Sequence, residues 1–428
     1  MAALLLAQAA DGTFVYWFGG WEPRGGTVIG ISFAIDALGA ALACFVAVLF
    51  VLAFVFSWRY FNAAGPFFHA LMLVFLAACM GFSLTGDLFN LFVFFELLSV
   101  AAYALTAYDI EEAGPLQGTL NVAVTNSVGA FLVLTGIGLL YGRTGSLNMA
   151  EIGVALADGP ADGLVVGAFV LITVGFLTKA AIVPFHFWLA DAYAVAPTPV
   201  CLLLSAAVSE LGLYALARVY WTVFAGPLED GEEAVRAVLV GAGVLTALVG
   251  GVMCVAQRHL KRMLAFATIS HVGLFLVGIG LLDGAALGGT AIYLAADGLV
   301  KASLFVSVGA IQHRYASVNE LRLRGRGRDL PVTGALMAPG GLALASLPPF
   351  GPFLGKAILE TAAEEVGTPG SSCPWSRSPC SPAARSCARP DGSSWARATP
   401  TSGPTSTTPR AMRPIRSSST ATTAFPPR

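Results

Sequence analysis

Six ionisable side chains lie inside long apolar stretches of this sequence: Glu96, Lys179, Glu210, His271, Lys301 and Lys356. A charge at the centre of a bilayer costs about 2.5–3.5 kcal/mol on insertion scales, so such residues usually have a function. Buried carboxylate and ammonium groups that lie near each other control each other's protonation. A histidine can bridge them near neutral pH. These residue types therefore predict a proton relay inside a membrane.

A structural alternative stands beside this prediction. Each of these side chains can belong to a packed ion pair, and one near the end of a span can extend its charge to the interface. Asp36 and Asp87 lie near span ends, so this explanation suits them and we leave them out of the relay. Asp297 lies one helical turn before Lys301.

The composition indicates a membrane protein. Of the 428 residues, 56% are hydrophobic and 11% are charged, whereas soluble domains carry about 25% charged residues. The net charge of −1 gives no electrostatic basis for binding nucleic acid. The sequence contains no CxxC pair, no dinucleotide-binding glycine motif and no P-loop. We therefore expect no cofactor and no metal ligands.

Ten stretches are long and apolar enough to form membrane spans, since a helical span needs about 20 such residues. They are residues 31–56, 67–85, 88–107, 118–141, 164–182, 199–224, 235–255, 263–282, 287–309 and 334–362. Proline interrupts two of them: Pro184 follows Lys179, and the run Pro348–Pro352 precedes Lys356. Broken helices in a membrane usually line a cavity, because their freed backbone groups need partners. The predicted fold is all-α, with about ten transmembrane helices of which two are broken.

The composition also divides the chain into three parts. Residues 1–30 are an outer-side N-terminal segment, residues 31–366 a transmembrane domain and residues 367–428 a tail. From Ser371 onward the tail consists largely of Ser, Pro, Thr, Ala and Arg, with eight arginines, no lysine and one acid. Such a tail is either intrinsically disordered or the product of a shifted reading frame in a GC-rich gene. We favour the shifted frame.

Four motifs follow one another along the transmembrane part. Gly86–Leu97 places a glutamate in an aromatic helix, Lys179–Pro199 contains the first break, Leu260–His271 opens a span, and Leu347–Lys356 contains the second break. In that order they resemble the fifth, broken seventh, tenth and broken twelfth helices of the antiporter-like subunits. These subunits occur in respiratory complex I, membrane-bound hydrogenases and Mrp-type cation/proton antiporters. The resemblance covers residues 15–366.

Within that family the segment Phe14–Trp21 looks most like the Mrp D subunit. The resemblance implies two inverted five-helix repeats, each with one broken helix. It also implies that Glu96 pairs with Lys179 in a first half-channel. Lys301 would then lie on a central polar axis with His271 as a bridge, and the second half-channel would end at Lys356.

Two features depart from the family pattern. The eighth helix of the family usually carries a lysine on the central axis, where this chain has Glu210. A carboxylate can relay protons as well, but it reverses the local charge. The first two and last two helices of the family have no counterpart in this sequence.

The resemblance implies an ion-translocating subunit of a multisubunit Na⁺ or K⁺/proton antiporter in a bacterial cell membrane. Its expected partners are other subunits, the lipid bilayer, protons and Na⁺ or K⁺, and not nucleic acid. An alternative is a proton-pumping membrane subunit of NADH:quinone oxidoreductase or a hydrogenase, without a redox site of its own. In either case we expect a transporter subunit rather than a self-contained enzyme. A standalone transporter or receptor with no relay is a third possibility, in which Glu96→Ala or Lys179→Ala would be silent.

Overall fold

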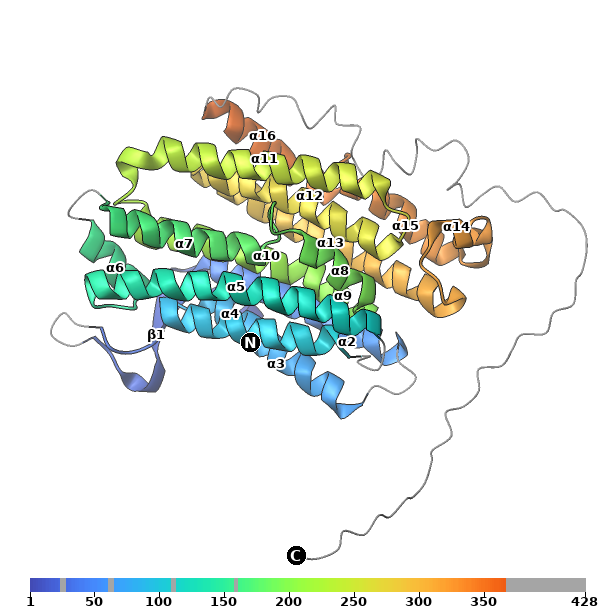
Figure 1. Ribbon diagram of the computed structural model, residues 1–428, viewed down its shortest axis with the longest axis horizontal. Coiled ribbons are helices and arrows are strands. Elements are labelled where there is room, and N and C mark those ends of the chain that lie inside the picture. Colours follow the sequence, from blue (N-terminus) through green and yellow to red (C-terminus); the bar gives the residue numbers. More distant parts are fainter. Residues whose placement is uncertain (24–27, 61–64, 109–112, 158–160, 367–428) are drawn as a thin grey trace, which may run out of the picture.

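The structure, a computed structural model, is a bundle of long helices that run side by side (Figure 1). It describes residues 1–23, 28–60, 65–108, 113–157 and 161–366. The predicted tail from residue 367 lies outside the described residues. Along the chain, the first half of the bundle (blue to green in Figure 1) lies against the second half (yellow to orange).

Eight helical segments of the described part are long and apolar enough to cross a membrane. They are α2 (Ala37–Tyr60), α3 (Pro66–Leu84), α4 (Leu88–Thr106), α5 (Ala113–Thr144), the continuous run Thr198–Phe224, α11 (Glu232–Ala256), α12 (Leu260–Gly280) and α13 (Gly284–Tyr315). The continuous run consists of α9 (Thr198–Leu203), the π-helical turn η2 (Leu204–Val208), α10 (Ser209–Val219) and a second π-helical turn, η3 (Tyr220–Phe224).

Two shorter apolar helices, α7 (Gly163–Lys179) and α15 (Pro331–Leu344), complete a set of ten. Each of the ten corresponds to one of the predicted spans, so the prediction of a multi-pass, all-α membrane fold is confirmed. The described short helices are α1 (Ala2–Ala9), η1 (Phe18–Gly20), α6 (Met149–Leu156), α8 (Phe187–Val195), η4 (Glu229–Gly231), α14 (Glu320–Leu323), η5 (Arg326–Asp329) and α16 (Gly351–Glu365).

The start predicted for the first span, at residue 31, is wrong. Strand β2 (Ser32–Ile35) pairs antiparallel with β1 (Phe14–Trp17), so this stretch is part of a hairpin rather than of a helix. Helix α2 begins only after Asp36, whose side-chain oxygen accepts a hydrogen bond from the backbone N–H of Gly39 at 2.9 Å. A side chain in this position satisfies a free N–H of the first helical turn, which sets where the helix begins.

Both predicted helix breaks are present. Helix α7 ends at Lys179 and α8 begins at Phe187, while α15 ends at Leu344 and α16 begins at Gly351. The first break is tied to the second half of the bundle, because the N–H of Val183 donates to the Thr246 hydroxyl of α11 at 3.1 Å.

A second bond joins the two halves after α8. The Lys261 ammonium of α12 donates to the carbonyl oxygen of Ala196 at 3.0 Å. Within the first half, the Trp188 indole N–H donates to the carbonyl oxygen of Thr178 at 3.0 Å. Backbone groups that the break removes from the helix ladder thus find partners inside the protein, as a membrane interior requires.

Glycines allow the long helices to approach closely. A Cβ added to Gly175 of α7 would lie 2.5 Å from the carbonyl oxygen of Gly129 on α5. A Cβ on Gly273 of α12 would lie 2.6 Å from the carbonyl oxygen of Gly243 on α11. Close backbone contact through small residues is a main source of helix association in lipid, and here it fixes the helices that carry the buried charges.

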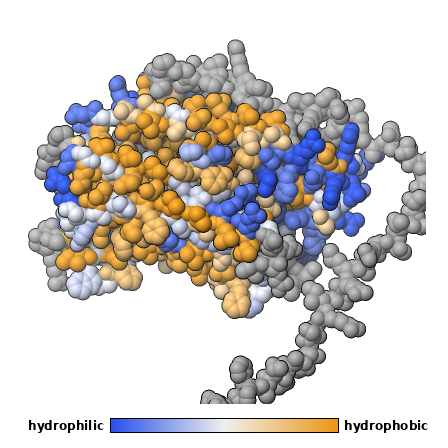
Figure 2. Space-filling model, in the orientation of Figure 1, coloured by the Kyte–Doolittle hydropathy of each residue, from blue (hydrophilic) through white to orange (hydrophobic). Residues whose placement is uncertain are grey.

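Figure 2 shows apolar side chains over most of the visible face of the bundle, with hydrophilic residues gathered at the end where Figure 1 labels α14. Many large apolar side chains are exposed along the spans, such as Val124 and Phe131 on α5 and Val238 on α11. An apolar surface of this kind suits lipid.

Candidate functional site

Lys179 is the last residue of α7, directly before the first break, and only 2% of it is exposed. Its ammonium donates a hydrogen bond to the hydroxyl of Ser99 on α4 at 2.5 Å and lies 4.8 Å from the ring centroid of Phe95. The Ser99 hydroxyl in turn donates to the carbonyl oxygen of Phe95 at 2.7 Å, which orients its lone pairs toward the lysine. Cation–π contact and a hydroxyl acceptor thus stabilise a charge that water does not reach.

Glu96 lies next to this group on α4. It interacts electrostatically with Lys179, but its Oε1 atom is buried and has no hydrogen-bond partner among the described residues. The pairing of Glu96 with Lys179 that the resemblance implied stays a prediction, and the hydrogen bond of the Lys179 ammonium in the structure goes to Ser99. We call Glu96, Ser99 and Lys179 the Lys179 cluster.

The second group of buried charges centres on Asp297 of α13, which is fully buried. One carboxylate oxygen lies 2.7 Å from Nδ1 of His271 on α12, and the other forms an ion pair with Lys301 one turn later on α13. The Lys301 ammonium also lies 5.7 Å from the ring centroid of Phe275. We call His271, Asp297 and Lys301 the Asp297 cluster.

Tyr293 extends the Asp297 cluster toward the second break. Its ring packs against that of His271, and its hydroxyl lies 3.0 Å from the hydroxyl of Ser346, just before α16. Neither Tyr293 nor Asp297 was among the predicted relay residues. The signal was present in the sequence, since Tyr293, Asp297 and Lys301 follow one another at intervals of four and so share one face of a helix.

Glu210 of α10 is fully buried, and within the described part of the chain neither of its carboxylate oxygens has a hydrogen-bond partner. It interacts electrostatically with Lys301 and Asp297, which places it beside the Asp297 cluster. Two residues later, Gly212 lies against the end of α7, where an added Cβ would meet the backbone nitrogen of Ala180 at 3.0 Å. Helix α10 therefore packs directly between the first break and the Asp297 cluster.

Lys356 of α16 is more accessible than Lys179, Glu210, His271 and Lys301. Its ammonium lies 3.6 Å from a carboxylate oxygen of Glu360, and the two side chains are 17% and 40% exposed. The structure thus groups Glu96 with Lys179, and His271 with Lys301, while Lys356 has its own partner.

The two acidic residues left out of the prediction have structural contacts. Asp36 forms an ion pair with Arg218 at 2.8 Å. Asp87 caps α4 by accepting the backbone N–H of Asn90 at 2.8 Å, and burial raises the pKa of this carboxyl. Both contacts fix helix ends.

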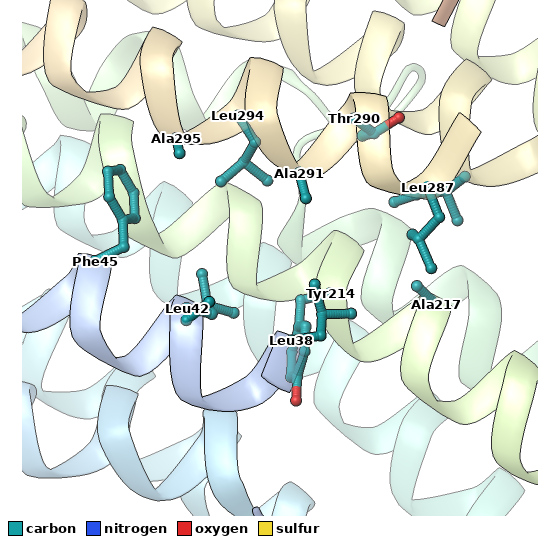
Figure 3. Close-up of a pocket in the computed structure, with 12 residues that line it drawn as sticks. Leu38, Leu42, Phe45, Tyr214, Ala217, Leu287, Thr290, Ala291, Leu294 and Ala295 are labelled. Carbon is teal, nitrogen blue, oxygen red and sulfur yellow. The ribbon is translucent and has the colours of Figure 1, made fainter. Parts of the chain in front are cut away.

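An apolar pocket lies between α2, α10 and α13 (Figure 3). Leu42 and Phe45 of α2 face Leu294 of α13 across it, and Tyr214 of α10 lines it as well. Among the described residues that line this pocket, none is a predicted relay residue. Among the described residues, no group of three His, Cys, Asp or Glu side chains is placed to hold a metal ion.

Comparison with known proteins gives the family. The family described as NADH:quinone oxidoreductase/Mrp antiporter, transmembrane, matches residues 85–368. The chain is 33% identical to the N subunit of the NADH-quinone oxidoreductase of Desulforudis audaxviator, over 82% of this chain and 70% of that protein. It is 30% identical to the D subunit of the Na⁺/H⁺ antiporter of Bacillus subtilis, over 79% of this chain and 67% of that protein. It is also 30% identical to the D subunit of a probable K⁺/H⁺ antiporter of Rhizobium meliloti, over 88% and 74%.

Two solved structures share the fold. One is the Mrp complex of Dietzia sp., with a TM-score of 0.77 and 28% identity over 87% of this chain and 68% of that one. The other is a membrane-bound sulfane sulfur reductase, an archaeal respiratory complex, with a TM-score of 0.77 and 27% identity over 87% and 75%. The matched family, the sequence relatives and the shared architecture agree with the resemblance read from the sequence motifs. The chain therefore belongs to the transmembrane family that NADH:quinone oxidoreductases and Mrp antiporters have in common.

Proposed function

We propose that this protein is an ion-translocating subunit of a multisubunit monovalent cation/proton antiporter in a bacterial plasma membrane. The relatives named as D subunits of Na⁺/H⁺ and K⁺/H⁺ antiporters and the likeness to the Mrp complex support this role. The observation that carries it is the burial of Lys179 at the end of a broken helix, against the Ser99 hydroxyl and near Glu96.

In this proposal protons move along Glu96, Lys179, Glu210, His271, Lys301 and Lys356. A lysine beside a carboxylate can take up and release a proton as the charge of its neighbour changes. Asp297 belongs to the path as well, because it joins His271 to Lys301. The two broken helices would give the buried groups access to opposite sides of the membrane.

The proposal predicts the effect of Lys179→Ala on ion exchange. The full chain would be expressed with its partner subunits in cells that lack antiporters. Exchange would be measured in inside-out vesicles as the collapse of a pH gradient on addition of Na⁺ or K⁺. We expect Lys179→Ala to abolish exchange and Ser99→Ala to slow it, because Ser99 positions the ammonium. Thr106→Ala is the matched control, since Thr106 is also a buried α4 residue, and its hydroxyl donates to the carbonyl oxygen of Ala102 in the preceding turn. If the Lys179→Ala variant exchanges cations for protons at the normal rate, the proposal is wrong.

The second candidate is a proton-pumping membrane subunit of a respiratory oxidoreductase. The identity of 33% to the N subunit of an NADH-quinone oxidoreductase favours it. In that case redox chemistry in other subunits would drive the same buried charges. Purification of the complex separates the two candidates: flavin and iron–sulfur subunits that copurify would favour the oxidoreductase, and small membrane subunits alone would favour the antiporter.

A further inference from the structure

Besides the Asp297–Lys301 ion pair, the surroundings of Glu210 contain four buried oxygen atoms for which the described residues provide no hydrogen bond of good geometry. They are both carboxylate oxygens of Glu210, the hydroxyl of Ser209 and the hydroxyl of Tyr193 on α8. All three residues are fully buried. Buried polar groups are nearly always paired, so these unpaired ones require an explanation, such as a bound water molecule, a proton or an ion.

The charges nearby do not neutralise Glu210. Asp297 and Lys301 form an ion pair, so their charges compensate each other. Glu210 interacts electrostatically with both, and its own charge has no partner within that pair. A buried carboxylate of this kind is stable only when it is neutralised, either by a proton or by a cation bound to it.

The available ligands suit a small hard cation. The Tyr193 hydroxyl lies beside the hydroxyls of Ser209 and Thr268, yet neither Tyr193 nor Ser209 completes a hydrogen bond of good geometry. The π-helical turn η2 ends directly before Ser209. Such a turn lengthens the hydrogen-bond ladder and is often found at functional sites. One carboxylate and two hydroxyl oxygens match the charge and the ligand preference of a single Na⁺ or K⁺ ion.

We propose that Glu210, with the hydroxyls of Ser209 and Tyr193, binds either one proton or one Na⁺ or K⁺ ion, and never both. The exchange is balanced: the cation forms its bond to the carboxylate as the proton leaves that carboxyl group for solvent. This inference deepens the proposed function, on which it rests, by assigning the cation a place in the chain.

Other titratable groups face this region. Asp297 and Lys301 of α13 and Tyr193 of α8 interact electrostatically with Glu210. His271 of α12 contacts Asp297, so it belongs to the group of charges that surrounds Glu210. Other buried ionisable groups on elements packed against α10 are Lys179 of α7, Cys79 of α3, Lys261 of α12 and Tyr220 of η3. The pH dependence of binding must therefore be compared with that of a Glu210 variant.

The test is proton release on cation binding. The full chain, purified with its partner subunits in detergent, would be placed in weak buffer with a pH indicator, and NaCl or KCl would be added. Choline chloride serves as the control for ionic strength. We expect about one proton released per bound cation, and about a tenfold weaker apparent affinity for each pH unit of acidification, because the two ligands compete for one group.

Three variants make the assignment specific. Glu210→Gln keeps the shape of the side chain, removes the exchangeable proton and should abolish proton release. Glu233→Gln makes the same substitution at an exposed glutamate and should leave release unchanged. Tyr193→Phe should weaken the apparent affinity without changing the one-to-one ratio, since it removes a ligand and not the charge.

Two outcomes would overturn the inference. If Glu210→Gln releases protons as the unaltered chain does, the cation binds elsewhere, and the proposed antiporter role survives. If neither Na⁺ nor K⁺ releases protons from the unaltered chain while vesicles still exchange ions, the oxygens around Glu210 hold water instead. Loss of exchange in the vesicles as well would instead remove the proposed function itself.

Discussion

Removal of the Asp297 carboxylate should destabilise the protein strongly and selectively. Asp297 is fully buried, accepts from His271 at 2.7 Å and pairs with Lys301. Asp297→Ala leaves the Lys301 charge without its partner, and breaking a buried ion pair costs about 3–5 kcal/mol. We expect about 3 kcal/mol, at the lower end, because an unfolded chain in detergent also finds polar partners for its charges.

A second substitution separates the ion pair from the loss of packing. Asp297→Ala combined with Lys301→Met removes both charges, so only the lost His271 hydrogen bond and a small cavity remain. These should cost about 1–2 kcal/mol together. The double variant should therefore be more stable than Asp297→Ala alone, by more than about 1 kcal/mol.

The free energy of unfolding would be measured by denaturant titration of the purified chain in mixed micelles, with helix content as the signal. Arg262→Ala is the control, because its ion pair with Asp191 at 3.2 Å is exposed to water. Such a pair is worth about 0–1 kcal/mol. If Asp297→Ala unfolds within about 1 kcal/mol of the unaltered chain, or if the double variant is the less stable one, the buried pair does not stabilise the fold as we reason.

Three further predictions concern the helices. Gly175→Ala should destabilise the chain by about 1–3 kcal/mol, because the new methyl group overlaps the α5 backbone, whereas Gly138→Ala meets no atom within 4 Å and should have little effect in the same titration. Asp87→Ala should cost about 1 kcal/mol through loss of the α4 cap, and Asp87→Asn should keep most of it; equal losses for both would contradict the capping role. Burial and neighbouring cations lower the pKa of His259 to about 4, and its ring caps α12 in the neutral form. Between about pH 6.5 and 4 the unfolded chain binds more protons at His259 than the folded chain does. The stabilisation by the His259 cap is therefore complete above about pH 6.5 and falls as the pH drops toward 4. His259→Asn should show a smaller loss over that range than the unaltered chain.

Part of this architecture was predictable from local signals. Length and hydropathy located the eight long spans and the two shorter apolar helices, because a bilayer of fixed thickness requires helices of similar length. Proline located both breaks, since it lacks the N–H that a helix needs. The start of the first span was missed because Phe33 and Ile35 are as apolar in a hairpin as in a helix.

The site was predictable only as a set of residues, not as a set of contacts. Apolar surroundings singled out Lys179 and Glu210, but nothing near them in the sequence indicates the Ser99 hydroxyl or the unpaired hydroxyl of Tyr193. The contact between His271 and Asp297 joins residues 26 positions apart on two helices. Such pairings depend on the rotation of each helix about its axis, which weak periodicity in all-round apolar helices does not define.

Two of the hydrogen bonds between the halves have a consequence for biogenesis. Val183 and Ala196 flank α8 in the first half, but their partners, Thr246 and Lys261, are synthesised about 60 residues later. Because the chain emerges from the ribosome N-terminus first, the first break cannot reach its final bonding when α7 enters the membrane. It must wait until α11 and α12 have been inserted. An incomplete chain that stops before Thr246 would therefore present unpaired backbone groups in lipid, and membrane quality-control proteases could recognise it by them.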